Sequence, residues 1–379
     1  MIIRNGNIFT QNEKFQKGQV YINGKKIEKI SYEDDLSIEK EIVLDAEDMY
    51  VLPGLVDIHS HGALGCDFCD ATATAFRTLE DYQLKNGVTT LCAATMTLSY
   101  EELEDIIKAF RDYKDQSRGV ISGITMEGPF LSYEKKGAQN ALHIKKPDIE
   151  FLEKMQEKSG SYIKQVAIAP ETELAMEFIE TAAKEMVVSL AHTTADYATA
   201  ERAFESGATH VTHLFNGMNP FSHREPGVIG AAFDKKDVYV ELICDGVHIH
   251  PAMVRSAFRL FGAKRVCMIS DSIRAAGMKD GEYSLGGQKV FLNTGVATLE
   301  DGTIAGSVCN LYECLKKAVK EMQIPLEDAV LSATKTPAMS LGMEKECGIL
   351  AEGRNADILV LDKNLDIRYV MKNGEIIEK

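Results

Sequence analysis

The chain has 379 residues, of which 45% are hydrophobic and 26% charged, and its formal net charge is −15 at pH 7. This length fits one large domain with a modest second unit, and the composition is that of a folded globular protein rather than a disordered or fibrous one. The acidic balance argues against nucleic acid or a membrane surface as a partner, and an anionic substrate would need a local basic group.

The sequence shows no sign of export or membrane insertion. Residues 1–10 lack the basic and apolar regions of a signal peptide, and no apolar run approaches the ~20 residues that span a bilayer. The eight cysteines are mostly scattered along apolar stretches, so we expect reduced thiols rather than a disulfide framework. We therefore expect a cytoplasmic protein.

Both ends of the chain show short β-strands separated by turn signals. The β-rich segments are residues 2–8, 20–22 and 26–30 at one end, and residues 358–361, 367–371 and 375–377 at the other. Asn23-Gly24 and Asn373-Gly374 are type I′ hairpin signals. Neither end can bury a core alone, so we place both in one discontinuous β-sandwich domain, residues 1–52 plus 345–379.

Residues 53–344 alternate between apolar strands and amphipathic helices. Eight β-rich runs lie near residues 54–59, 88–95, 120–126, 163–169, 187–191, 210–214, 238–244 and 265–270. Helical periodicity fills most of the intervals, for example residues 101–113 and 149–157. Eight parallel strands in roughly 290 residues predict an α/β fold of the (β/α)₈ TIM-barrel type, with a doubly wound open sheet as the rival.

Potential metal ligands occur where five of these runs end. They are His59 and His61 in the first run, Glu127 in the third, His192 in the fifth, His213 in the sixth and Asp271 in the eighth. In a closed barrel these ends converge on one mouth, where barrel active sites lie, whereas an open sheet would spread them over tens of ångströms. The convergence favours the barrel.

These residue types suit a divalent metal. His59 and His61 are two residues apart, so both side chains can lie on one face of a strand and bind one ion. With the other two histidines and Glu127 they form a nitrogen and oxygen set suited to Zn²⁺, or to Fe²⁺, Co²⁺ or Mn²⁺. Asp271 is the remaining carboxylate and can take a proton from water. Each residue alone could be structural, but their joint position at strand ends predicts a metal site.

Longer motifs give the barrel a family resemblance. Residues 52–62, LPGLVDIHSHG, resemble the first strand of the amidohydrolase superfamily. Eight more motifs resemble the N-acetylglucosamine-6-phosphate deacetylases: MEGPFL at 126–131, KKGAQN at 135–140, AHT at 191–193, THLFNGMNP at 212–220, HREPG at 223–227, CDGVHIHP at 244–251, SDSIRAAG at 270–277 and DGTIAGS at 301–307. The resemblance covers the whole barrel, and residues 348–362 resemble the β-sandwich of that family.

The resemblance implies hydrolysis of N-acetyl-D-glucosamine 6-phosphate to acetate and D-glucosamine 6-phosphate. Glu127, His192 and His213 match the metal ligands of the family, and Asp271 matches its catalytic acid and base. The positions that match substrate contacts are Ala138, Gln139, Asn216, Gly217, Arg224, Asp245, His248, Ile304, Ala305 and Gly306. In some members a basic residue reaches across a dimer interface, which implies a homodimer. The Arg224 guanidinium also suits a phosphate.

Two features leave questions open. Some members lack the His-x-His pair and hold one metal, whereas this chain keeps His59 and His61, so one ion or two are possible. Many members carry a histidine where this chain has Gln139, and that histidine resembles an electrophile for the substrate carbonyl. A glutamine can donate a neutral hydrogen bond but has no proton to transfer. We therefore expect the carbonyl to depend more on the metal.

Three alternatives remain. The substrate could be N-acetylgalactosamine 6-phosphate, because the sequence does not fix the stereochemistry at C4. A cyclic-amide hydrolase such as a dihydroorotase usually carries a carbamylated lysine on the fourth strand, but here that strand ends Ile168-Ala169-Pro170. A non-catalytic barrel used for assembly would be expected to have lost ligands, and this chain retains the full set.

Overall fold

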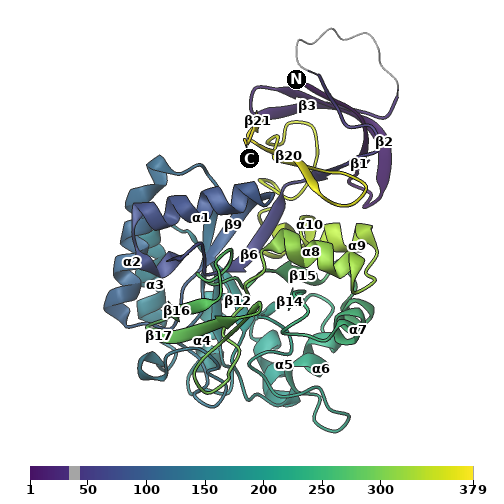
Figure 1. The fold of residues 1–379 in the computed structure, drawn as a ribbon. Coiled ribbons are helices and arrows are strands. Elements are labelled where there is room, and N and C mark those ends of the chain that lie inside the picture. The colour runs from purple at the N-terminus through teal and green to yellow at the C-terminus, as the bar shows by residue number, and fades with distance from the viewer. Residues whose placement is uncertain (34–42, 379) are drawn as a thin grey trace.

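The structure, a computed structural model, describes residues 1–33 and 43–378. A barrel of strands wrapped by helices forms the larger part, and a small β-domain that contains both termini lies at one end of it (Figure 1). The barrel sheet has eight parallel strands in sequence order: β6 (Leu55–Ser60), β9 (Val88–Ala94), β10 (Ile121–Met126), β11 (Ile163–Ile168), β12 (Val187–Leu190), β13 (His210–Val211), β14 (Tyr239–Ile243) and β15 (Val266–Ile269).

The first and last strands of this sheet meet. Beyond the end of β15, Asp271 N donates to His59 O at 2.9 Å, and His61 N donates to Ser272 O at 2.8 Å. The predicted (β/α)₈ barrel is therefore confirmed, and the open-sheet alternative is wrong. Each strand lies within the run predicted for it, except that β6 extends one residue further.

Helices cover the outside of the barrel (Figure 1). They are α1 (Ala73–Lys85), α2 (Tyr100–Tyr113), α3 (Ile149–Ser159), α4 (Ala175–Ala182), α5 (Tyr197–Glu205), α6 (Gly227–Asp234), α7 (Pro251–Phe261), α8 (Leu311–Lys320), α9 (Leu326–Ser332) and α10 (Lys335–Ser340), with 3₁₀ turns η1 (Phe68–Asp70), η2 (Lys114–Gln116) and η3 (Ala141–His143). Helix α2 illustrates how the local sequence determines a helix. Ser99 and Glu102 form a capping box at its start. Its buried face then follows helical spacing at Leu103, Ile107 and Phe110.

Short strands interrupt the barrel in two places. The pair β7 (Gly62–Ala63) and β8 (Cys66–Asp67) follows the first barrel strand. A three-stranded antiparallel sheet, β16 (Gly281–Leu285), β17 (Gln288–Asn293) and β18 (Val296–Thr298), separates β15 from α8. Gln288 Nε2 donates to Ala138 O at 2.5 Å, so this sheet is fastened to the loop that follows β10.

Strands from both ends of the chain share one sheet in the small domain. They are β1 (Ile2–Phe9), β2 (Phe15–Asn23), β3 (Lys26–Ser31), β4 (Val43–Asp45), β5 (Tyr50–Pro53), β19 (Ile358–Leu361), β20 (Ile367–Lys372) and β21 (Glu375–Ile376). The pairing of Leu52 with Leu359 joins the two ends. The sheet also curls back on itself, since Ile27 N donates to Arg354 O at 2.9 Å.

A separate apolar core fills the fold of this sheet, with Ile8, Val20 and Ile358 among its buried members. Asn373 and Gly374 have φ values of 51° and 80°, as a type I′ hairpin requires. The exact domain limits, 1–52 plus 345–379 against 53–344, stay a prediction, and residues 34–42 and 379 lie outside the described part.

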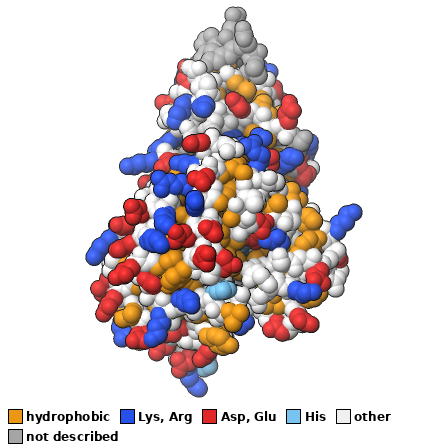
Figure 2. All heavy atoms as spheres, turned by 90° about the vertical axis from the view of Figure 1, so that its left-hand side faces the viewer, with side chains coloured by type: hydrophobic (Ala, Val, Ile, Leu, Met, Phe, Trp, Pro, Cys, Tyr) orange, Lys and Arg blue, Asp and Glu red, His pale blue; other side chains and the backbone are white. Residues whose placement is uncertain are grey.

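The surface and the thiols agree with the composition. Acidic and basic side chains are interspersed over the face shown in Figure 2, with apolar side chains between them. All eight cysteines are free thiols. Among residues 1–33 and 43–378, no helix is both long and apolar enough to cross a membrane.

Candidate active site

A cavity of about 280 Å³ opens at the mouth of the barrel, where the carboxyl ends of the strands meet. Its lining residues are His61, Met96, Glu127, Gly137, Ala138, Gln139, His192, His213, Asn216, Gly217, His248, Asp271, Ile273, Leu285, Thr303, Ile304 and Gly306. Five of the six potential ligands reach its wall, and His59 lies fully buried beneath it. The structure thus brings together every residue of the predicted metal set.

Glu127, His192 and His213 form the first donor group. Glu127 Oε1 lies 3.0 Å from His213 Nε2 and 3.2 Å from His192 Nε2, and the two Nε2 atoms are 3.2 Å apart. Donor atoms bound tetrahedrally to one ion at about 2.1 Å would be separated by about 3.4 Å. The three donor atoms are therefore already spaced as one metal ion requires.

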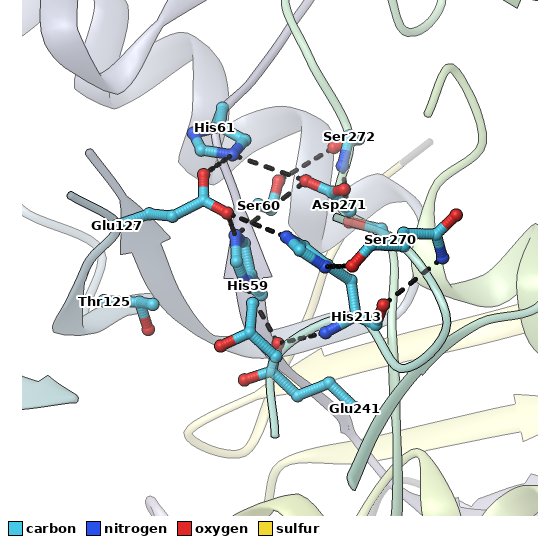
Figure 3. Close-up of polar contacts among 12 residues, drawn as sticks. His59, Ser60, His61, Thr125, Glu127, His213, Glu241, Ser270, Asp271 and Ser272 are labelled. Atoms are coloured by element: carbon cyan, nitrogen blue, oxygen red, sulfur yellow. Dashed lines mark hydrogen bonds and ion pairs between the residues drawn. The ribbon is translucent and has the colours of Figure 1, made fainter. Parts of the chain in front are cut away.

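His59, His61 and Asp271 form the second donor group. Asp271 Oδ1 lies 3.3 Å from His61 Nε2 and 3.9 Å from His59 Nε2. Glu127 links the groups, because its Oε2 lies 3.3 Å from His61 Nε2 and its Oε1 lies 3.6 Å from His59 Nε2 (Figure 3). The carboxylate of Glu127 is thus placed between both sets of donors.

Hydrogen bonds on the far side of three imidazoles fix their orientation. Nδ1 of His192 lies 2.8 Å from Lys135 O, and Nδ1 of His213 lies 3.1 Å from Asn216 O. Nδ1 of His59 lies 2.9 Å from Glu241 Oε2. A proton on each Nδ1 leaves the Nε2 lone pair free for a metal. His59 Nε2 is buried and has no hydrogen-bond partner in the part of the chain that the structure describes, which fits a metal ligand.

The electrostatics of the cluster favour a cation. Burial alone would raise the pKa of the Glu127 carboxyl, but the charge of His59 and the bonds from His192 and His213 hold it well below its usual range. Burial lowers the pKa of His61, but Asp271 and Glu127 together raise it to about 9. The carboxylates that hold protons on these histidines would equally hold a divalent ion, which competes with those protons.

Backbone strain marks the same strand ends. His192, His213 and Asp271 have φ values of 43°, 29° and 48°, in a region that residues other than glycine rarely adopt. Such strain persists where the surrounding structure holds it and is typical of functional sites. Gly217 has a φ of 62°, and a Cβ there would lie 2.9 Å from His192 Nδ1, so only glycine fits beside this imidazole.

Most predicted substrate contacts reach the cavity. Those that line it are Ala138, Gln139, Asn216, Gly217, His248, Ile304 and Gly306. Asp245 is buried behind the wall, where its Oδ1 accepts the N–H of His248 and its Oδ2 lies 2.7 Å from His248 Nδ1. Ala305 is buried between two lining residues. Arg224 is exposed and does not line the cavity, so the Arg224 of this chain does not reach its own pocket.

Gln139 faces the metal ligands. Its Nε2 donates to Glu127 Oε2 at 2.5 Å, and its Oε1 accepts the N–H of Thr97 at 2.8 Å. Both hydrogen bonds hold the amide in place, and the side chain is only 3% exposed. Gln139 therefore orients a ligand of the first donor group, a contact that its sequence motif did not reveal.

Other contributors to the site were not assigned from the sequence. Glu241, the partner of His59, is fully buried on β14. Its signal was a lone carboxylate in the apolar strand YVELI. Met96, Ile273 and Leu285 add an apolar wall, and no sequence signal distinguishes them from core residues.

Known proteins resemble this chain over its whole length. The sequence profile of the amidohydrolase family matches residues 50–377. The N-acetylglucosamine-6-phosphate deacetylase of Bacillus subtilis (strain 168) is 34% identical, over 99% of this chain and 96% of the relative. An N-acetylgalactosamine-6-phosphate deacetylase of Escherichia coli O157:H7 is 30% identical, over 88% of both chains.

A solved structure gives the same picture. A mutant of the N-acetyl-D-glucosamine-6-phosphate deacetylase of Mycobacterium smegmatis, in complex with N-acetyl-D-glucosamine-6-phosphate, has a TM-score of 0.93 and 32% sequence identity. The match covers 99% of this chain and 98% of that chain. The expected fold and family are both confirmed. This chain belongs to the amidohydrolase family and, within it, to the N-acetylglucosamine-6-phosphate deacetylases.

Proposed function

We propose that this chain hydrolyses the acetamide of N-acetyl-D-glucosamine 6-phosphate, with water as the second substrate and acetate and D-glucosamine 6-phosphate as products. The observation that carries this proposal is the convergence of two donor groups, one of which contains Asp271, on one cavity. Among the described residues that line that cavity there is no Ser or Cys, so neither of these two nucleophiles is placed to form a covalent acyl intermediate.

Asp271 is the residue placed to move protons. Burial raises the pKa of its carboxyl. The hydrogen bond from His61 and the charges of His59 and His61 together have the larger effect and hold this pKa below its usual value. The carboxylate is therefore ionised and can accept a proton from the attacking water. It then returns that proton to the nitrogen of the departing amine, so the same group acts as base and acid.

Five residues supply most of the metal donors: His59, His61, Glu127, His192 and His213. Asp271 completes the second donor group as an oxygen donor. A divalent ion held there supplies Lewis-acid chemistry, because it lowers the pKa of water and polarises an amide carbonyl. Zn²⁺ suits these nitrogen and oxygen donors best, with Fe²⁺, Co²⁺ and Mn²⁺ as alternatives. The two donor groups support two ions per chain, the second more weakly held.

The phosphate requires positive charge that the cavity wall supplies sparingly. Among the described residues that line the cavity, His248, held by Asp245, is the candidate outside both donor groups, and none is a Lys or Arg. Arg224 can serve only if it comes from a second copy of the chain, which is the reason for proposing a homodimer. A cytoplasmic location stays a prediction.

The decisive experiment measures acetate release from N-acetylglucosamine 6-phosphate together with metal content by elemental analysis. We expect turnover that depends on the bound metal. Protein replete with metal that releases no acetate would contradict the proposal.

N-acetylgalactosamine 6-phosphate is the second candidate substrate, because one relative of 30% identity acts on it by name. Comparison of kcat/KM for the two epimers decides between them. A higher value for the galactose epimer would reverse the assignment.

A further inference from the structure

Glu241 lies below the metal donors and touches no solvent. Its side chain rises from the middle of β14 toward the base of the donor cluster (Figure 3). Its Oε2 lies 2.9 Å from Nδ1 of His59, and both side chains are fully buried. An ionised carboxylate in such a place is costly unless it is paired and hydrogen-bonded.

A second contact holds Glu241 in position. Gln165 on β11 donates from Nε2 to Glu241 Oε1 at 2.6 Å. A longer contact of 3.4 Å brings the backbone N–H of His213 to Oε2. Glu241 is thus held by a residue of β11 and by the backbone just beyond β13, and its Oε2 faces His59 Nδ1.

The second donor group differs from the first in how its histidines are supported. His192 and His213 are held by backbone carbonyls, of Lys135 and Asn216. His61 Nδ1 has no hydrogen-bond partner among the described residues. Among the described residues of the second group, only His59 has a hydrogen-bond partner at Nδ1, and that partner is a carboxylate.

A carboxylate does two things that a carbonyl does not. It fixes the proton on Nδ1, as a carbonyl would, and it also adds a full negative charge behind the ring, which makes Nε2 a stronger donor. The charge lies on the side of the cluster where the second group sits. The second group should therefore gain cation affinity through His59, the only donor imidazole whose ring Glu241 contacts among the described residues.

We propose that Glu241 is a positioning residue for His59 and that it specifically makes His59, His61 and Asp271 a second cation site. This inference rests on the proposed function for its biological role, but the binding of ions can be measured without turnover. The claim concerns affinity at one donor group, so it predicts an unequal effect on two ions.

The test is a titration of chelator-treated protein with Co²⁺, followed by calorimetry and by the visible absorption of the bound ion. The wild-type chain should bind two equivalents. Glu241→Gln, which keeps the size and removes the charge, should bind the first equivalent within about twofold of wild type and the second at least tenfold more weakly, the usual cost of losing such a partner.

A matched control separates this effect from general loss of stability. Glu80→Gln also neutralises a fully buried carboxylate, but Glu80 lies on α1 and contacts none of the donors. Its two Co²⁺ affinities should equal those of wild type. Glu241→Asp, which keeps the charge but shortens the side chain, should recover part of the second affinity.

Three results would overturn the proposal: a single Co²⁺ equivalent in wild type, equal affinities in Glu241→Gln and wild type, or equal weakening of both ions. If Glu241→Gln does not fold, Gln165→Met decides, because it frees Glu241 without touching a ligand. It should weaken the second ion by several-fold, and an unchanged second affinity would reject the idea. Absence of acetate release in wild type would instead reject the proposed function alone.

Discussion

Glu80 and Glu127 are both buried carboxylates, at opposite ends of the same barrel. Glu80 lies beside the start of β10, where it accepts hydrogen bonds from Tyr113 Oη at 2.6 Å, Ser117 Oγ at 2.5 Å and the backbone N–H of Val120 at 3.0 Å. Every one of these donors is neutral, and together they tie η2 and the following loop to α1. Glu127 lies just past the other end of β10 and is surrounded by imidazoles.

The surroundings of the two carboxylates indicate different roles. Glu80 stabilises the fold, whereas Glu127 belongs to a cluster that a bound ligand would complete. Neutral donors stabilise the Glu80 carboxylate with nothing added. Around Glu127 the backbone is strained at His192 and His213, and His59 Nε2 lacks a hydrogen-bond partner in the described chain. Such an arrangement lowers stability by itself and is completed by a cation. Changes near Glu127 should therefore affect activity most, and changes near Glu80 should affect stability most.

Removal of the metal should have the largest effect. Chelation should abolish acetate release, and a divalent ion should restore it. The melting temperature should fall as well, because an ion at 100 times its Kd stabilises the folded state by about 2.7 kcal/mol. Calorimetric scans with and without chelator measure this. Full activity in protein that elemental analysis finds free of metal would contradict the idea that the cluster around Glu127 works by binding a cation.

Asp271→Asn should come next. Turnover should fall by at least ~10³, since the proton acceptor and donor are both lost, which corresponds to about 4 kcal/mol of barrier. The fold should remain, and at least one ion should still bind, because Glu127, His192 and His213 are intact. Steady-state kinetics with metal analysis on the same sample checks this. A near wild-type kcat would place the base elsewhere.

His248→Ala should act on binding. Loss of a charge-assisted contact to phosphate is worth about 1.5–3 kcal/mol, which raises KM for the phosphorylated sugar by roughly 10- to 150-fold. The slow reaction with unphosphorylated N-acetylglucosamine is the control and should change little. Equal losses on both sugars would show that His248 supports the fold through Asp245.

Arg224→Ala also tests how the phosphate is bound. Because Arg224 is exposed and outside the cavity of its own chain, a rise in KM requires a second copy. Sedimentation measurements alongside kinetics should then show a dimer. An effect on KM in a strictly monomeric protein would contradict the proposed exchange between copies.

Much of the barrel was predictable because each strand is a short apolar run, and five of the eight runs end in a histidine or a carboxylate. The candidate site residues at 59, 61, 127, 192, 213 and 271 follow from that regularity. Glu241 and Gln165 did not, because their partners are 182 and 76 residues away in sequence. The three-stranded sheet at 281–298 was also missed, since few residues of its first two strands are buried.

Glu80→Gln should test the structural side of the comparison. An amide in place of the carboxylate turns one acceptor into a donor that faces the N–H groups of Arg118, Val120 and Ile121, which should lower the free energy of unfolding by about 1–3 kcal/mol. Urea unfolding measures this, and kcat should stay within about twofold of wild type. A larger change in kcat than in stability would show that Glu80 also supports the active site at the other end of the barrel.

Gln139→Ala should have the smallest effect of the series. The substitution removes one hydrogen bond from the uncharged Gln139 amide to Glu127 Oε2 and one acceptor for Thr97 N–H, and it leaves every metal donor in place. A loss of about 0.5–1.5 kcal/mol in kcat/KM is expected, because Glu127 keeps its contacts to His192 and His213. Gln139→His should preserve or raise kcat, since an imidazole can also donate a hydrogen bond. A loss in Gln139→Ala as severe as in Asp271→Asn would mean that Gln139 also holds the acetamido group during the reaction. The side chain would then contact both Glu127 and the substrate.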